Sequence, residues 1–159
     1  MVPAGLVVSL HVAATAASPV QTLDRVQAVV GLGLEGDRYF SITGTYSKIP
    51  GTGRQLTLIE IEAIEALQRE YDLTIAPGQA RRNVVTRGIA LNHLVGREFF
   101  VGEARLYGRR LCEPCAHLEK LTIPGAMLGL IHRGRLRADI LTGGAIRTGD
   151  PIFAINDHR

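Results

Sequence analysis

The two cysteines of this chain, Cys112 and Cys115, are separated by Glu113 and Pro114, where the sequence pattern changes from strand-like to helix-like. Two thiols at this spacing can bind a soft metal ion, carry sulfur, or alternate between dithiol and disulfide. Cys115 follows Pro114 at an expected helix start, where unpaired N–H groups and the helix dipole favour the thiolate. We therefore predict that Cys115 is the chemically active residue. Cys112 either packs at the end of the strand or resolves an oxidised Cys115 by disulfide exchange.

Arginine supplies nearly all of the positive charge. Of the 18 lysine and arginine residues, only Lys48 and Lys120 are lysine. A guanidinium group binds phosphate or carboxylate through two parallel hydrogen bonds, which an ammonium group cannot do. Seven arginines lie just ahead of the cysteine pair, between residues 81 and 110, namely Arg81, Arg82, Arg87, Arg97, Arg105, Arg109 and Arg110. Most of them are expected to be ordinary surface residues, but their density before the cysteines suits an anionic ligand.

Histidines offer two further possibilities near the cysteines. His93 and His117 are candidate proton donors, because imidazole titrates near neutral pH. Cys112, Cys115, His117 and His132 could also supply four zinc ligands, but their spacing does not match a usual zinc-finger pattern. Neither role is assigned from the sequence.

Size and composition indicate one cytoplasmic domain over residues 1–159. The chain has 159 residues, 46% of them hydrophobic, which is enough for one core. Two cysteines are too few for a disulfide framework, so we expect a reducing cytoplasm. The apolar first twenty residues contain no lysine or arginine and resemble a buried strand more than an export signal. No apolar stretch is long enough to span a membrane. Aromatic residues make up only 5% and no recognition motif is present, so nucleic acid is not expected as a partner.

Short apolar runs between glycines and prolines predict a mainly β protein, with a barrel and a few flanking α-helices. One helix is predicted over 60–71 from its apolar stripe, and two further helical regions are predicted after Pro114 and over 125–132. Residues 41–53 read as a loop that could border a binding site, and 144–152 as a tight turn before a closing strand. The predicted strands cover 6–12, 23–30, 55–59, 83–86, 98–101, 104–111, 136–141 and 151–155. In the strand over 104–111, polar and small or apolar residues alternate, which predicts one buried face and one polar face. The polar positions are Arg105, Tyr107 and Arg109, and the others are Ala104, Leu106 and Gly108.

Four segments, taken together, resemble the MOSC family, which is named after the C-terminal domain of molybdenum cofactor sulfurase. The closing Gly149-Asp150 turn is also similar to that family, and the resemblance extends over nearly the whole chain, as in a stand-alone MOSC domain. The four segments are 33–39 (GLEGDRY), 54–60 (RQLTLIE), 81–89 (RRNVVTRGI) and 112–115 (CEPC).

The resemblance implies a β-barrel whose cleft binds the pyranopterin molybdenum cofactor or transfers sulfur to it. Cys115 matches the family's characteristic cysteine, which implies a ligand to molybdenum or a carrier of persulfide. Arg82 and Asn83 resemble the residues that contact the anionic side of the pterin, and Arg81 replaces Arg82 if the strand register differs by one residue. Arg38 and Arg54 are further candidates for this anion site. Asp37 and Arg38 are also expected to form a local ion pair that fixes the turn at Gly36.

The leading function is therefore a cofactor-dependent reductase of N-hydroxylated small molecules. The sequence contains no ferredoxin spacing and no dinucleotide fingerprint, so a partner protein has to donate the electrons. The alternative is a non-redox sulfur carrier that receives a persulfide on Cys115 from a cysteine desulfurase and holds no cofactor after purification. A thioredoxin-like dithiol module and a pure binding module are the remaining hypotheses. The sequence leaves the oligomeric state open.

Overall fold

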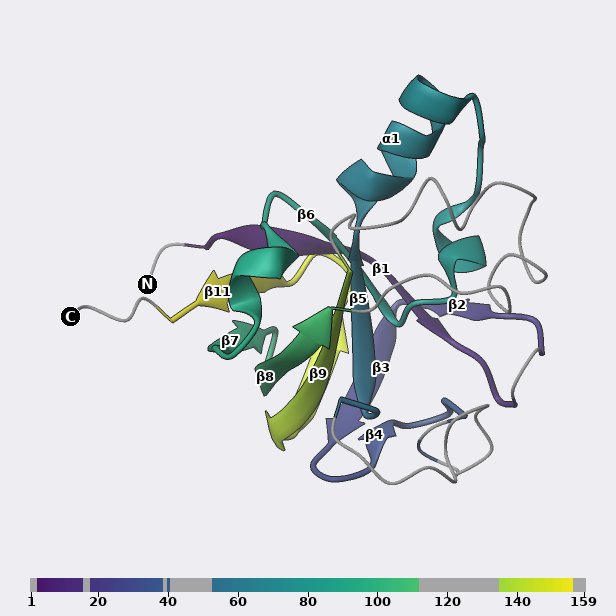
Figure 1. The fold of residues 1–159 in the computed structure, drawn as a ribbon. Helices are drawn as coiled ribbons and strands as arrows, with labels where there is room; N and C mark the ends of the chain where they lie inside the picture. The colour runs from purple at the N-terminus through teal and green to yellow at the C-terminus, as the bar shows by residue number, and fades with distance from the viewer. Residues whose placement is uncertain (1–2, 16–17, 39, 41–52, 112–134, 156–159) are drawn as a thin grey trace.

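The computed structural model describes residues 3–15, 18–38, 40, 53–111 and 135–155. Within these ranges the chain forms a mainly β fold with one α-helix (Figure 1). The predicted fold class is therefore confirmed. The strands are β1 (Gly5–Val12), β2 (Gln21–Leu23), β3 (Arg25–Val29), β4 (Gly33–Leu34), β5 (Leu56–Glu60), β6 (Val84–Arg87), β7 (Glu98–Val101), β8 (Ala104–Leu111), β9 (Arg135–Thr142), β10 (Gly144–Arg147) and β11 (Pro151–Ala154).

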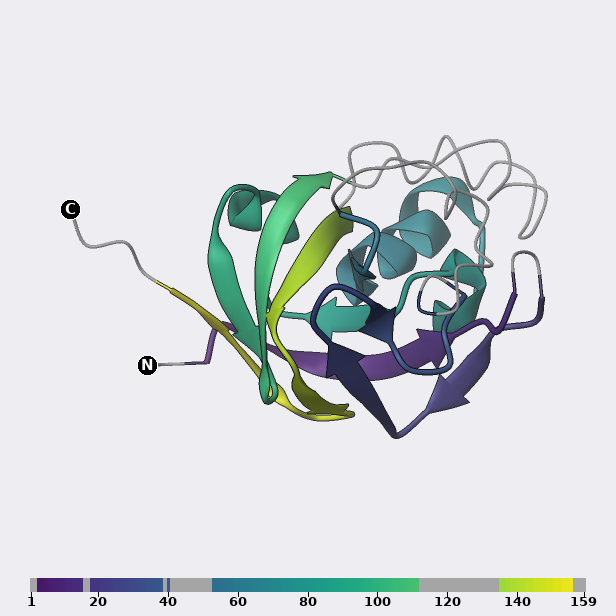
Figure 2. The same cartoon turned by 90° about the horizontal axis from the view of Figure 1, so that it is seen from below.

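Seven strands close into a barrel in the order β11, β7, β8, β9, β5, β6, β1, because β1 pairs again with β11. The β5–β6 pair is parallel, and the other neighbours in the ring are antiparallel. Strand β2 extends the sheet beyond β1, and β10, β3 and β4 form a second small sheet (Figure 2). Closure leaves the ring strands without free edges and fixes their positions relative to one another.

Alternating side chains build the barrel core. In β8, Ala104, Leu106 and Gly108 are buried, whereas Arg105 and Tyr107 between them are partly exposed, as the sequence predicts. Burial of a leucine side chain contributes roughly 1.5–3 kcal/mol to folding, so this alternation fixes which face of the strand turns inward. Fully buried core side chains include Leu10, Leu56, Leu58, Phe99, Leu106, Leu136 and Ile146.

The helix α1 (Ile61–Tyr71) follows β5 directly and agrees with the predicted range 60–71. Its apolar stripe packs with Ile59 and Val85 in a second core outside the barrel. The helix ends at Asp72, whose left-handed backbone (φ 54°) lets its N–H bond to the carbonyls of Gln68 and Leu67. This packing covers one part of the outer face of β5 and β6 and leaves the neighbouring part to polar residues.

Three short strands were not predicted from the sequence. The range 23–30 is divided at Asp24, with β2 ending before it and β3 starting after it. Strand β4 has only two residues, and β10 occupies the first half of the segment that reads as a turn. The turn itself is confirmed between β10 and β11, where Asp150 Oδ2 accepts a hydrogen bond from Arg147 N at 2.7 Å. The helical regions expected after Pro114 and over 125–132 lie outside the described residues.

Two 3₁₀ helices connect the strands near the candidate site. These are η1 (Pro77–Ala80), which leads into β6, and η2 (Leu91–Leu94), which precedes β7. In the described ranges, no helix combines the length and apolar character needed to cross a membrane.

Candidate functional site

Polar residues from β5, β6 and β1 form a continuous row on the outer face of the barrel. Leu58 and Val84 are direct partners and point into the core, so the preceding Thr57 and Asn83 lie on the opposite face. His11 continues the row next to Asn83, because Leu10 pairs with Val84. All three polar residues are buried. The row therefore places hydrogen-bonding groups beside the apolar contact of α1.

Asn83 joins the three strands through its side-chain amide. Its Oδ1 accepts hydrogen bonds from Thr57 N at 3.0 Å and from Thr57 Oγ1 at 3.1 Å. Its Nδ2 donates to the carbonyl oxygen of His11 at 3.1 Å. The predicted contact of Asn83 with a cofactor stays a prediction, and the structure adds a second role, because the same side chain ties β6 to β5 and β1.

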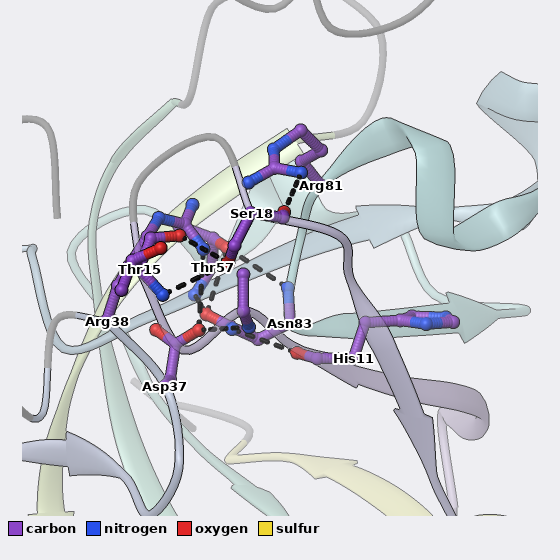
Figure 3. A network of polar contacts seen from close by, with 9 residues as sticks. His11, Thr15, Ser18, Asp37, Arg38, Thr57, Arg81 and Asn83 are labelled. Carbon is purple, nitrogen blue, oxygen red and sulfur yellow. Dashed lines mark hydrogen bonds and ion pairs between the residues drawn. The ribbon is translucent and has the colours of Figure 1, made fainter.

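The segment after β4 brings Asp37 and Arg38 to the end of β1. Asp37 Oδ1 accepts hydrogen bonds from Ala13 N at 3.1 Å and from Arg38 Nη1 at 3.4 Å. Gly36 turns the chain with φ 86°, a conformation that glycine adopts without strain. The predicted ion pair at this turn is therefore confirmed. It carries Arg38 into the same polar network as Thr57 and Asn83 (Figure 3).

Arg81 and Arg82 precede β6 and lie next to Asn83 in the chain. Arg81 ends η1 in a left-handed conformation (φ 57°), and its Nη1 donates to the carbonyl oxygen of Ser18 at 2.8 Å. Arg82 is buried, with 8% of its surface exposed. We call Arg38, Arg81, Arg82, Asp37 and Asn83 the arginine cluster. It contains three cations and one carboxylate, so its charge favours an anionic ligand.

The remaining predicted site residues are Arg54, three histidines and the cysteine pair. Arg54 is half-buried one residue before Gln55, whose Oε1 accepts a hydrogen bond from Ile140 N at 2.9 Å. His93 is exposed on η2 and does not belong to the network in Figure 3. The cysteine pair and both remaining histidine candidates, His117 and His132, lie outside the described residues. Among the described residues, no group of three or more His, Cys, Asp or Glu side chains could hold a metal ion.

Sequence reasoning missed Thr57 and His11 as parts of this network. Thr57 lies between Leu56 and Leu58, and a polar residue at an alternate strand position is a signal that could have identified it. His11 lies in an apolar run and gives no comparable signal. Its Nε2 is 2.8 Å from Ser9 Oγ, and its Nδ1 is 3.1 Å from Thr22 Oγ1. The ring therefore joins β1 to β2.

We expect His11 to make the protein less stable in weak acid. Burial disfavours the charged imidazolium and lowers the pKa of His11 below the ordinary histidine value of about 6.5. Below about pH 6.5 the unfolded chain therefore binds a proton that the folded chain does not, and the free energy of unfolding decreases as the pH falls toward the folded-state pKa. Urea unfolding from about pH 8 to about pH 5 would measure this. His11→Gln should make the free energy of unfolding less dependent on pH, whereas His93→Gln, which changes an exposed histidine, should leave the pH dependence unchanged. The same pH dependence in both variants would contradict the assignment of this effect to His11.

Comparison with known proteins identifies the fold and the family. Three solved structures share the fold: YuaD from Bacillus subtilis (21% identity, TM-score 0.74, 93% of each chain covered), YiiM from Geobacillus stearothermophilus (14%, 0.65, 96% of this chain and 74% of that chain) and YiiM from Escherichia coli (19%, 0.64, 94% and 71%). A search of curated proteins found no match. The family model of the MOSC domain matches residues 45–153, so the chain belongs to the MOSC domain family.

Proposed function

We propose that this MOSC protein binds the pyranopterin molybdenum cofactor and reduces N-hydroxylated small molecules, with the Cys115 thiolate as the protein ligand of the metal. The observation that carries the proposal is the arginine cluster, of which Arg81, Arg82 and Asn83 lie within residues 45–153 that the MOSC family model matches. When bound, the cofactor would supply the two-electron chemistry of the reaction. Two electrons and two protons convert an N–OH group to N–H and water. A partner protein donates the electrons, because the sequence holds no motif for a redox cofactor of its own.

The chemistry of the arginine cluster fits the anionic part of such a cofactor. Guanidinium groups at Arg81 and Arg82 can hold a phosphate through paired hydrogen bonds, and Arg38 adds positive charge beside them. The Nδ2 group of Asn83 carries two hydrogens, of which the His11 carbonyl accepts one. The second hydrogen can form a hydrogen bond with the edge of the pterin ring and so orient it. Arg54, half-buried before β5, is proposed as an additional anion contact.

The metal content of the purified protein tests this function. After expression in a cofactor-producing host, we expect about one molybdenum per chain in the wild type and a loss of nearly all of it in Cys115→Ser, because the metal loses its thiolate ligand. Cys112→Ser is the matched control and should keep most of the metal. Elemental analysis of freshly isolated protein gives the readout.

Other outcomes of the same experiment contradict the reductase proposal. Absence of molybdenum from the wild type, combined with one added sulfur on Cys115 after exposure to a cysteine desulfurase, would identify a sulfur carrier instead. Intact-mass measurement detects that sulfur. Equal metal loss in Cys112→Ser and Cys115→Ser would indicate a dithiol or zinc site formed by both cysteines.

A further inference from the structure

Ser9 and His11 lie two residues apart on β1, and their side chains are in contact. Ser9 Oγ is 2.8 Å from His11 Nε2, which is within hydrogen-bond distance. Residues at this spacing share one face of a strand, and Leu10 between them points into the core. Ser9 is partly exposed, whereas only 3% of the His11 surface is exposed. A hydroxyl group that solvent reaches is therefore bonded to an imidazole ring that is almost entirely shielded.

The imidazole ring is held in place from two sides. Its Nδ1 is 3.1 Å from Oγ1 of Thr22, which is the direct partner of His11 in the β1–β2 ladder. A Cβ atom placed on Gly78 of η1 would be 3.3 Å from His11 Nδ1 and 3.5 Å from His11 Cε1. A side chain at position 78 would crowd the ring, so glycine lets η1 pack against it. The ring itself extends away from Asn83 and Asp37 (Figure 3).

The hydrogen bonds of the ring suit a base that faces Ser9. A neutral imidazole carries one hydrogen. With this hydrogen on Nδ1, the ring donates to Thr22 Oγ1 and accepts from the Ser9 hydroxyl through Nε2. Burial favours the neutral ring, because desolvation lowers the pKa of His11. His11 is therefore predominantly neutral at neutral pH and has a free electron pair for the proton of Ser9.

We propose that Ser9 is a nucleophile, that His11 is its general base, and that this pair accepts acyl groups from activated esters. A hydroxyl, a base within hydrogen-bond distance and a third group that orients the base are the parts of such a site. Ser9 Oγ forms a bond to the acyl carbon while its proton moves to His11 Nε2. The bond from the acyl carbon to the ester oxygen then breaks, and this oxygen leaves with the electron pair and takes up the proton. Thr22 is a positioning residue.

The surroundings of the ring determine which esters can react. Within the described part of the chain, the side chains bonded to the His11 ring are two hydroxyls, and neither carries the negative charge with which an aspartate stabilises an imidazolium. Burial also disfavours the imidazolium that forms when Ser9 loses its proton. We therefore expect reaction with aryl esters, whose leaving group is a weak base, and slow reaction with alkyl esters. This activity does not depend on the molybdenum chemistry proposed above.

Acetylation by p-nitrophenyl acetate tests the site. We expect the wild type to release p-nitrophenolate and to carry an acetyl group on Ser9, which peptide mapping by mass spectrometry distinguishes from acetylation of the cysteines. His11→Gln should slow the acetylation of Ser9 at neutral pH by roughly 100-fold or more, because the general base is lost. Ser18→Ala is the matched control. It removes a hydroxyl that bonds to the backbone of Thr15 instead of a histidine, and it should leave the acetylation of Ser9 unchanged.

Two further measurements keep the proposal testable if His11→Gln does not fold. Thr22→Val removes the acceptor for Nδ1–H and should slow the acetylation of Ser9, whereas Thr22→Ser keeps the hydroxyl and should restore the rate. In the wild type, the rate should fall as the pH decreases through the pKa of His11, since a protonated ring cannot accept the proton. An unmodified Ser9 in the wild type would overturn the proposal. A rate proportional to hydroxide concentration from about pH 5 to about pH 9 would also overturn it, because such a rate needs no histidine.

Discussion

Asp37→Ala is expected to lower the free energy of unfolding by about 3–5 kcal/mol. Asp37 is almost fully buried, and its Oδ1 accepts hydrogen bonds from both Ala13 N and Arg38 Nη1. Truncation removes the acceptor of a buried backbone N–H and the carboxylate partner of a buried guanidinium group. Urea unfolding at neutral pH measures the loss. The effect is large because the change leaves a positive charge in place without its adjacent negative one.

Asp37→Asn is the matched control for this prediction. The amide oxygen can still accept from Ala13 N, so this variant isolates the loss of negative charge and should cost less than Asp37→Ala. In a double-mutant cycle, Arg38→Met should reduce the cost of Asp37→Ala, because the cation that lost its partner is then gone. A cost below about 1 kcal/mol for Asp37→Ala would mean that this contact behaves like an exposed ion pair, contrary to its burial.

The sequence predicted the elements whose own residues determine them. The alternation in β8 and the apolar stripe of α1 follow from local periods, and both were confirmed. Strands β4 and β10 were missed because their stability depends on pairing with β3 rather than on their own composition. Local sequence carries little information about such pairing. The same limit applies to the candidate site, where individual residues could be predicted from the sequence but the contacts between distant residues could not.

Arg38, Arg81 and Asn83 were predicted from their motifs, but their shared network could not be. Arg38 reaches the others because Asp37 bonds to the end of β1, and Asn83 lies beside Thr57 because β5 and β6 are parallel. Those contacts join residues more than twenty positions apart. The contact of His11 with Thr22 is less predictable still, since it depends on the register of β1 with β2. One residue of difference would have turned Thr22 to the other face.

Asn83→Ala should cost roughly 3–5 kcal/mol of unfolding free energy, as judged by urea unfolding. The change removes three buried hydrogen bonds, to Thr57 N, Thr57 Oγ1 and His11 O, and it leaves two backbone groups without this partner. Thr57→Val is the matched control. It removes the hydroxyl, which donates to Asn83 Oδ1 and accepts from Asn83 N, but it keeps the Thr57 N–H bond to Asn83 Oδ1. Asn83 N retains the Thr57 carbonyl oxygen as an acceptor, so we expect a cost of only about 1–2 kcal/mol.

Molybdenum content per folded molecule then separates the two roles of Asn83. If the side chain only joins β5, β6 and β1, any metal loss should follow the loss of stability, and stabilising conditions such as an added osmolyte should restore it in both variants. If Asn83 also contacts the cofactor, Asn83→Ala should remain deficient in metal after its folding is restored, whereas Thr57→Val recovers. Recovery of the metal in both variants would therefore restrict Asn83 to its structural role. Binding of the anion would then rest on the arginines alone, since a guanidinium group retains its positive charge whichever protein groups it contacts.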